Sequence, residues 1–134
     1  MYLALLNERE KNVFLGMAYN LASIDGNYSD AEKIMINGYC QELQCQFDEN
    51  NMIKPMESLI QYVKVNSSEK TKKIFIFELV GLAMADENYD SDERMLINQM
   101  LKEYNLNSGF ADQCENILNE YIGFQKRIND LVLE

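Results

Sequence analysis

The residues best suited to chemistry lie in two short acidic segments. Each segment has oxygen-bearing side chains at alternate positions and a glutamate three residues further on. Seven of these side chains are candidate metal ligands: Asp25, Asn27 and Glu32 in the first segment, and Asp86, Asn88, Asp90 and Glu93 in the second. Carboxylate and amide oxygens are ligands that Ca²⁺ prefers, and an EF-hand loop opens with the same alternation. The pattern therefore predicts a divalent-cation site.

Neither segment is a complete EF-hand loop. Position 6 of such a loop is a glycine, but this chain has Asp30 or Ser91 there. Position 12 is a bidentate glutamate, but this chain has Ile36 or Ile97. We therefore expect a weak site for Ca²⁺ or Mg²⁺ and no other cofactor. The second segment is the better candidate, because Asp90 supplies a carboxylate where the first segment has only a hydroxyl.

The same residues also fit a structural role as helix caps. Ser29-x-x-Glu32 has the spacing of a capping box, in which each of two residues accepts a hydrogen bond from the backbone of the other. Asp90-x-x-Glu93 is its acidic analogue. Such a cap typically stabilises a helix by about 1 kcal/mol. The sequence leaves both roles open, with capping first and cation binding second.

An aromatic residue precedes each cap and a basic residue follows it. The pairs are Tyr28 with Lys33 and Tyr89 with Arg94. The aliphatic stem and the charge of a basic side chain both pack well on an aromatic ring. We expect each pair to be in contact.

The two acidic segments belong to a longer internal repeat. Residues 21–37 return without a gap as residues 82–98, 61 positions later, and eight of the seventeen aligned residues are identical. The repeat predicts an internally duplicated helical bundle, in which two three-helix halves, about 8–65 and 69–131, are related by a pseudo-twofold axis. Both halves belong to a single predicted domain, 1–134.

Apolar residues recur at helical spacing along almost the whole chain, which predicts an all-α fold. The expected helices cover 8–23, 30–44, a stretch from Pro55, 69–85, 91–104 and 110–131. The fourth is apolar nearly all round, which is typical of a central buried helix. The expected core includes Phe14, Leu21, Ala22, Phe77, Leu82 and Ala83.

Charge and composition narrow the function classes. The formal net charge is −10, and the chain has no histidine. An acidic chain lacks the basic footprint that nucleic-acid binding needs. The absence of histidine excludes histidine-based acid–base catalysis, serine and cysteine triads and most zinc sites, and leaves acid–base work by Asp or Glu only as a distant possibility. We expect no enzyme activity, no nucleic-acid partner and no membrane insertion.

Four further residues carry expectations of their own. The cysteines Cys40, Cys45 and Cys114 are odd in number and form no CxxC motif, which predicts free, largely buried thiols and a cytoplasmic location. Glu78 is the lone acid in the most apolar predicted helix. It is either a functional carboxylate or the partner of a cation such as Lys70, Lys73 or Arg94.

The first acidic segment also resembles a known family. An apolar helix ending in Ala-x-x-Asp-Gly-x-x-Ser-x-x-Glu looks like the TerB-like family, which is named for tellurite resistance and is also found fused to co-chaperone J-domains. The first copy matches at Ala22, Asp25, Gly26, Ser29 and Glu32. The second copy keeps Ala83, Asp86 and Glu93 but has Glu87 for the glycine and Asp90 for the serine. The resemblance implies a duplicated all-helical domain with a metal- or stress-related role and no catalytic activity.

Two functions follow from these features. The first is a non-enzymatic interaction or sensing module, whose paired acidic turns bind a divalent cation or a basic partner. The alternative is a protein–protein adaptor with purely structural turns and an apolar groove between the halves. Both imply a protein partner whose identity the sequence does not give.

Overall fold

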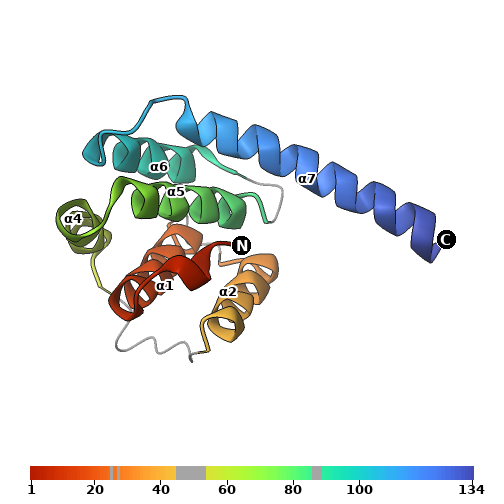
Figure 1. The fold of residues 1–134 in the computed structure, drawn as a ribbon, viewed down its shortest axis with the longest axis horizontal. Helices are drawn as coiled ribbons and strands as arrows, with labels where there is room; N and C mark the ends of the chain where they lie inside the picture. The colour runs from red at the N-terminus through yellow and green to blue at the C-terminus, as the bar shows by residue number, and fades with distance from the viewer. Residues whose placement is uncertain (25, 27, 45–53, 86–88) are drawn as a thin grey trace.

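The computed structural model describes residues 1–24, 26, 28–44, 54–85 and 89–134, and within these ranges it contains helices and no strand. This confirms the predicted all-α class. Figure 1 shows the arrangement. The elements are the 3₁₀ turn Leu3–Leu5 and the helices α1 (Glu8–Ala22), α2 (Asp30–Glu42), α4 (Met56–Asn66), α5 (Glu69–Ala83), α6 (Ser91–Glu103) and α7 (Phe110–Leu133). In the described part of the chain, no helix has both the length and the apolar character that crossing a bilayer requires.

The helices begin where the sequence supplies caps. Asn7 and Glu10 form a capping box at α1, and the Ser68 side chain accepts a hydrogen bond from the Thr71 backbone at α5. After α2 and α6, the chain passes through the left-handed residues Gln44 and Asn105, both at φ 56°. At α6 this gives a Schellman motif, since the backbone N–H after Asn105 donates to the Leu101 carbonyl at 2.9 Å.

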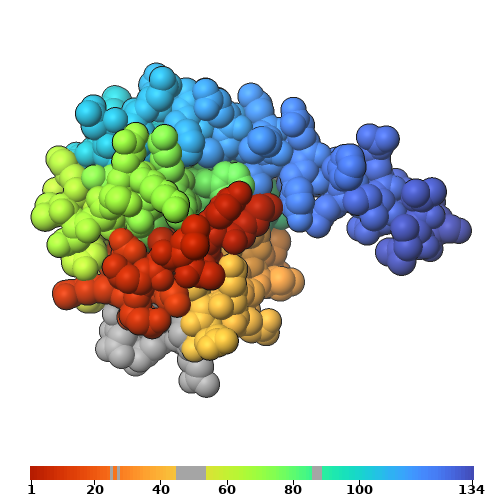
Figure 2. Space-filling view, viewed as in Figure 1, coloured from red at the N-terminus to blue at the C-terminus, as the bar shows by residue number. Residues whose placement is uncertain are grey.

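Helix lengths agree in two of the three pairs that the repeat relates. Helices α1 and α5 both have 15 residues and begin 61 positions apart, and α2 and α6 both have 13 residues with the same separation. The third helices differ, because α4 has 11 residues and α7 has 24. Figures 1 and 2 show that the C-terminal part of α7 projects from the body.

The core forms around α1 and α5, which contact each other and most other helices. Five of the six predicted core residues are almost completely buried: Phe14, Leu21, Ala22, Leu82 and Ala83. Burying side chains of this kind on one face of each helix is the main stabilising term in such a bundle.

The predictions for Phe77 and for the cysteines have different outcomes. The prediction that Phe77 lies in the core is wrong, because it is partly exposed and meets the Tyr2 ring edge-on at 5.7 Å. It lies on the side of α5 that carries Lys73 and Gly81, neither of which is buried. Cys40 and Cys114 are buried cysteines outside any disulfide, as predicted, while Cys45 lies outside the described residues. Burial raises the pKa of Cys114 to about 11.

Candidate functional site

The first acidic turn ends in a capping box at the start of α2. The Ser29 hydroxyl accepts a hydrogen bond from the Glu32 backbone N–H at 3.1 Å. In return, Glu32 Oε1 accepts from the Ser29 backbone N–H at 3.1 Å and from the Ser29 hydroxyl at 2.9 Å. These bonds help to satisfy a carboxylate that is only 3% exposed.

The second turn repeats this geometry at the start of α6. Asp90 Oδ1 accepts from the Glu93 backbone N–H at 2.9 Å, and Glu93 Oε1 accepts from the Asp90 backbone N–H at 3.3 Å. Glu93 is also only 3% exposed. Both predicted capping boxes are therefore confirmed.

The cation hypothesis stays a prediction. Of its candidate ligands, Asp25, Asn27, Asp86 and Asn88 lie outside the described residues. The remaining three are Glu32, Asp90 and Glu93, and each uses a carboxylate oxygen in a cap. The structure brings Asp90 and Glu93 together. Among the described residues, no three acidic, cysteine or histidine side chains are grouped as a metal site.

The aromatic–cation contacts are present in both turns, as predicted. Lys33 Nζ lies 5.4 Å from the centre of the Tyr28 ring. Arg94 Cζ lies closer to its ring, 3.9 Å from the centre of Tyr89. The second contact is thus the tighter of the two.

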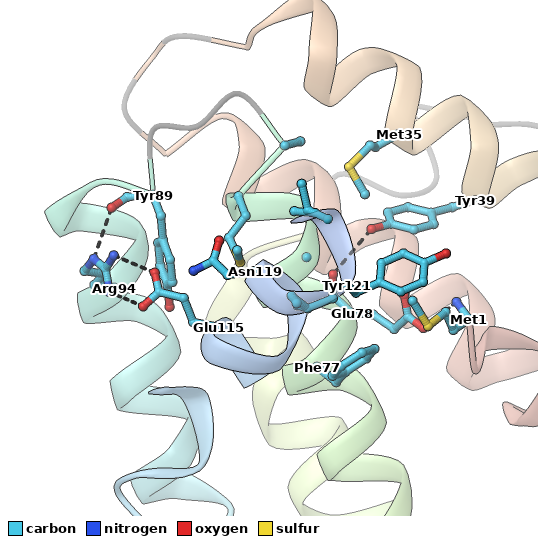
Figure 3. A pocket seen from close by; sticks show the side chains of 15 residues that line it. Met1, Met35, Tyr39, Phe77, Glu78, Tyr89, Arg94, Glu115, Asn119 and Tyr121 are labelled. Carbon is cyan, nitrogen blue, oxygen red and sulfur yellow. Dashed lines mark hydrogen bonds and ion pairs between the residues drawn. The ribbon is translucent and has the colours of Figure 1, made fainter. Parts of the chain in front are cut away.

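Arg94 also connects the second turn to α7. Its Nη1 and Nη2 donate to the two oxygens of Glu115 at 3.3 and 2.8 Å, and its Nε donates to the Tyr89 carbonyl at 3.1 Å (Figure 3). This fork-to-fork geometry fixes both side chains. Burial raises the pKa of the Tyr89 hydroxyl to about 12, although the nearby Arg94 charge acts in the opposite direction.

These residues stand at one end of a groove of about 740 Å³ between α2, α5 and α7. Figure 3 shows side chains from all three helices pointing into it. Most of the lining is apolar or aromatic, and it includes Met35, Tyr39, Phe77, Gly81, Met84, Tyr89, Leu118, Tyr121 and Ile122. A concave, mainly apolar surface with a few fixed polar groups is typical of a binding site.

Glu78 lies at the other end of this groove and is 6% exposed. Its Oε1 accepts hydrogen bonds from the Tyr2 backbone N–H and from the Met1 amino group, both at 2.8 Å. The expected pairing with a cation is confirmed, but the cation is the Met1 amino group and not Lys70, Lys73 or Arg94. Lys73 instead pairs with Glu69, and Arg94 with Glu115.

Sequence reasoning anticipated a groove between the halves as an alternative but named none of its residues. The available signal was the abundance of methionine, since adaptable Met side chains are common on binding surfaces, and Met35 and Met84 do line the groove. The other lining residues come from five separate segments of the chain. No local pattern brings these segments together.

Comparison with models of protein families, with curated proteins and with solved structures gives no match for this chain. The function is therefore argued from the groove and the turns themselves.

Proposed function

We propose that this protein is a non-enzymatic adaptor whose groove between α2, α5 and α7 binds an apolar segment of a protein partner. The observation that carries the proposal is the groove itself, with a volume of about 740 Å³ and a largely apolar lining. The described parts of the acidic turns support it indirectly. Their side chains are used in helix caps, so their presence is explained without a ligand.

The lining indicates the chemistry of the segment that fits. Phe77, Met84 and Ile122 offer apolar contacts, and methionine adapts its shape to a bound side chain. An amphipathic helix that presents apolar anchors one and two turns apart is the usual ligand of such a groove. Because the chain carries a net charge of −10, basic residues flanking those anchors increase the association rate and the selectivity.

We further propose that the chain is internally duplicated, belongs to the TerB-like family and has the cytoplasmic location that its cysteine content predicts. Matching lengths and starts of α1 with α5, and of α2 with α6, support the duplication. Equivalent left-handed residues, Gln44 and Asn105, support it too. An experimental structure in which residues 8–42 fail to superpose on residues 69–103 would contradict it.

Cation binding at the turns is a second proposal. The observation in its favour is that the carboxylates of Asp90 and Glu93 lie together at the start of α6, and carboxylate oxygens are ligands that Ca²⁺ and Mg²⁺ take in proteins. Calorimetric titration of Ca²⁺ and Mg²⁺ into the wild type and into an Asp86→Asn/Glu93→Gln variant tests it. We expect weak binding that the variant loses. No heat at millimolar metal, or equal binding by the variant, leaves capping as the role of these turns.

The groove is tested with three synthetic amphipathic helical peptides that share one leucine face and carry lysine, glutamine or glutamate on the other. Fluorescence anisotropy should show the tightest binding for the lysine peptide and the weakest for the glutamate peptide. Ile122→Lys, in the groove, should weaken binding at least ~10-fold. Ile34→Lys is the matched control, because Ile34 is 70% exposed and lies outside the groove.

Two results would contradict the adaptor proposal. One is that no peptide binds at hundreds of micromolar. The other is that Ile122→Lys and Ile34→Lys bind the lysine peptide equally.

A further inference from the structure

The C-terminal part of α7 carries an apolar stripe that the body of the protein does not cover. Seven positions in succession, alternately four and three residues apart, are apolar: Phe110, Cys114, Ile117, Tyr121, Phe124, Ile128 and Leu131. This is the heptad spacing of a coiled-coil seam. Cys114 packs into the body, whereas the last five side chains are between 46% and 83% exposed.

A stripe of this kind needs a partner of matching shape. Ile117, Phe124 and Ile128 are each about half exposed or more, and they lie on a helix that projects into solvent (Figure 2). Contiguous exposed apolar residues on a projecting helix mark an interaction surface. The helix does not suit an anionic membrane, because the chain from Glu120 onward has three acidic residues and two basic ones.

We propose that this stripe, Ile117 to Leu131, pairs with the same stripe of a second copy of the chain in antiparallel orientation. In that arrangement Tyr121 faces Phe124 of the second copy, and Ile117 faces Ile128. The contact is isologous, so each of these pairs occurs twice.

Charges beside the stripe select this partner and this orientation. Glu120 and Arg127 lie on the same flank of the helix, seven residues apart. When two copies run antiparallel, Glu120 of each copy faces Arg127 of the other, and two opposite-charge pairs form. When they run parallel, Glu120 faces Gln125 and Arg127 faces Val132, and no charge pair forms. Self-complementarity therefore exists for one orientation alone.

Tyr121 belongs both to the stripe and to the groove lining, so the pairing is tested at other positions of the stripe. Phe124 and Ile128 do not line the groove, so they can be changed without altering its walls. Both also lie beyond the last buried residue of α7, Leu118, so substitution there leaves the core of the body intact.

Sedimentation equilibrium of the full chain tests the pairing. The wild type should be a dimer at tens of micromolar and dissociate on dilution. Ile128→Lys should weaken dimerisation by roughly 100-fold or more, because the change occurs twice in the interface. Ile34→Lys is the matched control and should leave the dimer unchanged. A wild type that is monomeric at 200 μM, or an Ile128→Lys variant that still dimerises normally, would overturn the proposal.

Charge reversal tests the orientation. Glu120→Arg and Arg127→Glu should each weaken dimerisation by roughly 3- to 10-fold, and the double variant should restore it. Equal dimerisation of all four proteins would overturn the antiparallel arrangement. Binding of the monomer to phosphatidylserine vesicles through Ile128 would instead assign the stripe to a lipid surface.

Discussion

The two acidic turns share one capping geometry but differ in what the next basic residue contacts. In the first turn, Lys33 lies loosely over Tyr28 and 3.9 Å from the exposed Asp30 carboxylate. In the second, Arg94 stacks closely on Tyr89 and binds both oxygens of Glu115 on α7. Both turns thus form the same kind of cap. Only in the second turn does the basic residue, Arg94, connect the turn to α7 and to the groove.

The third helices show a larger difference of the same kind. Helix α4 ends after 11 residues and packs on α1, whereas α7 has 24 residues, contacts α5 and α6, and then projects into solvent. The groove and the apolar stripe both involve α7. Both features suited to binding therefore involve the longer of these two helices, together with α2 and α5 in the case of the groove.

The largest effect is expected where the repeats agree most closely. Leu21 and Leu82 occupy equivalent repeat positions, and both are fully buried. Replacing either leucine by alanine should lower the free energy of unfolding by about 2–5 kcal/mol, because a cavity replaces packed atoms. Urea denaturation measures both variants. A loss below about 1 kcal/mol in one of them would show that the two core positions are not equivalent.

Alkaline pH should destabilise the folded state through two buried tyrosines. The Tyr39 hydroxyl donates to the Glu78 carbonyl at 3.3 Å, and the Tyr104 hydroxyl donates to the Ile60 carbonyl at 3.2 Å. Burial, the largest cause in each case, raises both pKa values well above 10. The folded state therefore keeps protons that the unfolded state loses as pH rises past 10.

The contribution of these two tyrosines to the free energy of unfolding should be constant below pH 10 and should fall above pH 10. The expected loss is about 1 kcal/mol per tyrosine between pH 10 and pH 11. Denaturation at the two pH values measures it, and a Tyr39→Phe/Tyr104→Phe variant is the control. The wild type and the control should have different pH slopes, and equal slopes would contradict the assignment.

The two helix caps should each contribute a smaller amount to the free energy of unfolding, and the two amounts should be similar. Ser29→Ala and Asp90→Ala should each cost about 1 kcal/mol of unfolding free energy, because each removes the acceptor for a backbone N–H. The exchanges Ser29→Asp and Asp90→Ser keep that acceptor and should cost less. Thermal melts compare the four variants. If the exchanges destabilise the protein as much as the alanine substitutions do, these side chains do not stabilise it by capping.

The smallest expected effect on stability distinguishes Arg94 from Lys33. Arg94→Lys loses the two-pronged contact with Glu115 and should cost up to about 1 kcal/mol, whereas Lys33→Arg should change stability by less than about 0.5 kcal/mol. Arg94→Lys should also weaken binding of the lysine-bearing peptide, since Arg94 and Glu115 line the groove. Equal behaviour of the two variants would remove the distinction between the turns.

Local features of this fold were predictable, and long-range ones were not. Periodicity and caps predicted helix starts at residues 8, 30, 69, 91 and 110, which the structure confirms. The same periodicity failed for Phe77, because a helix that is apolar all round does not indicate which side stays uncovered. Glu78 meets the N-terminal segment 76 residues away. No spacing rule connects two such distant segments.

The central claim is that the groove between α2, α5 and α7 is a binding site, and NMR titration of the ¹⁵N-labelled protein with the lysine-bearing peptide tests it most directly. The largest amide shift changes should occur at groove residues such as Tyr39, Gly81 and Ile122. The exposed surface around Met95, which lies on α6 outside the groove, should change little. Changes centred on Met95, or spread evenly over the molecule, would contradict the account.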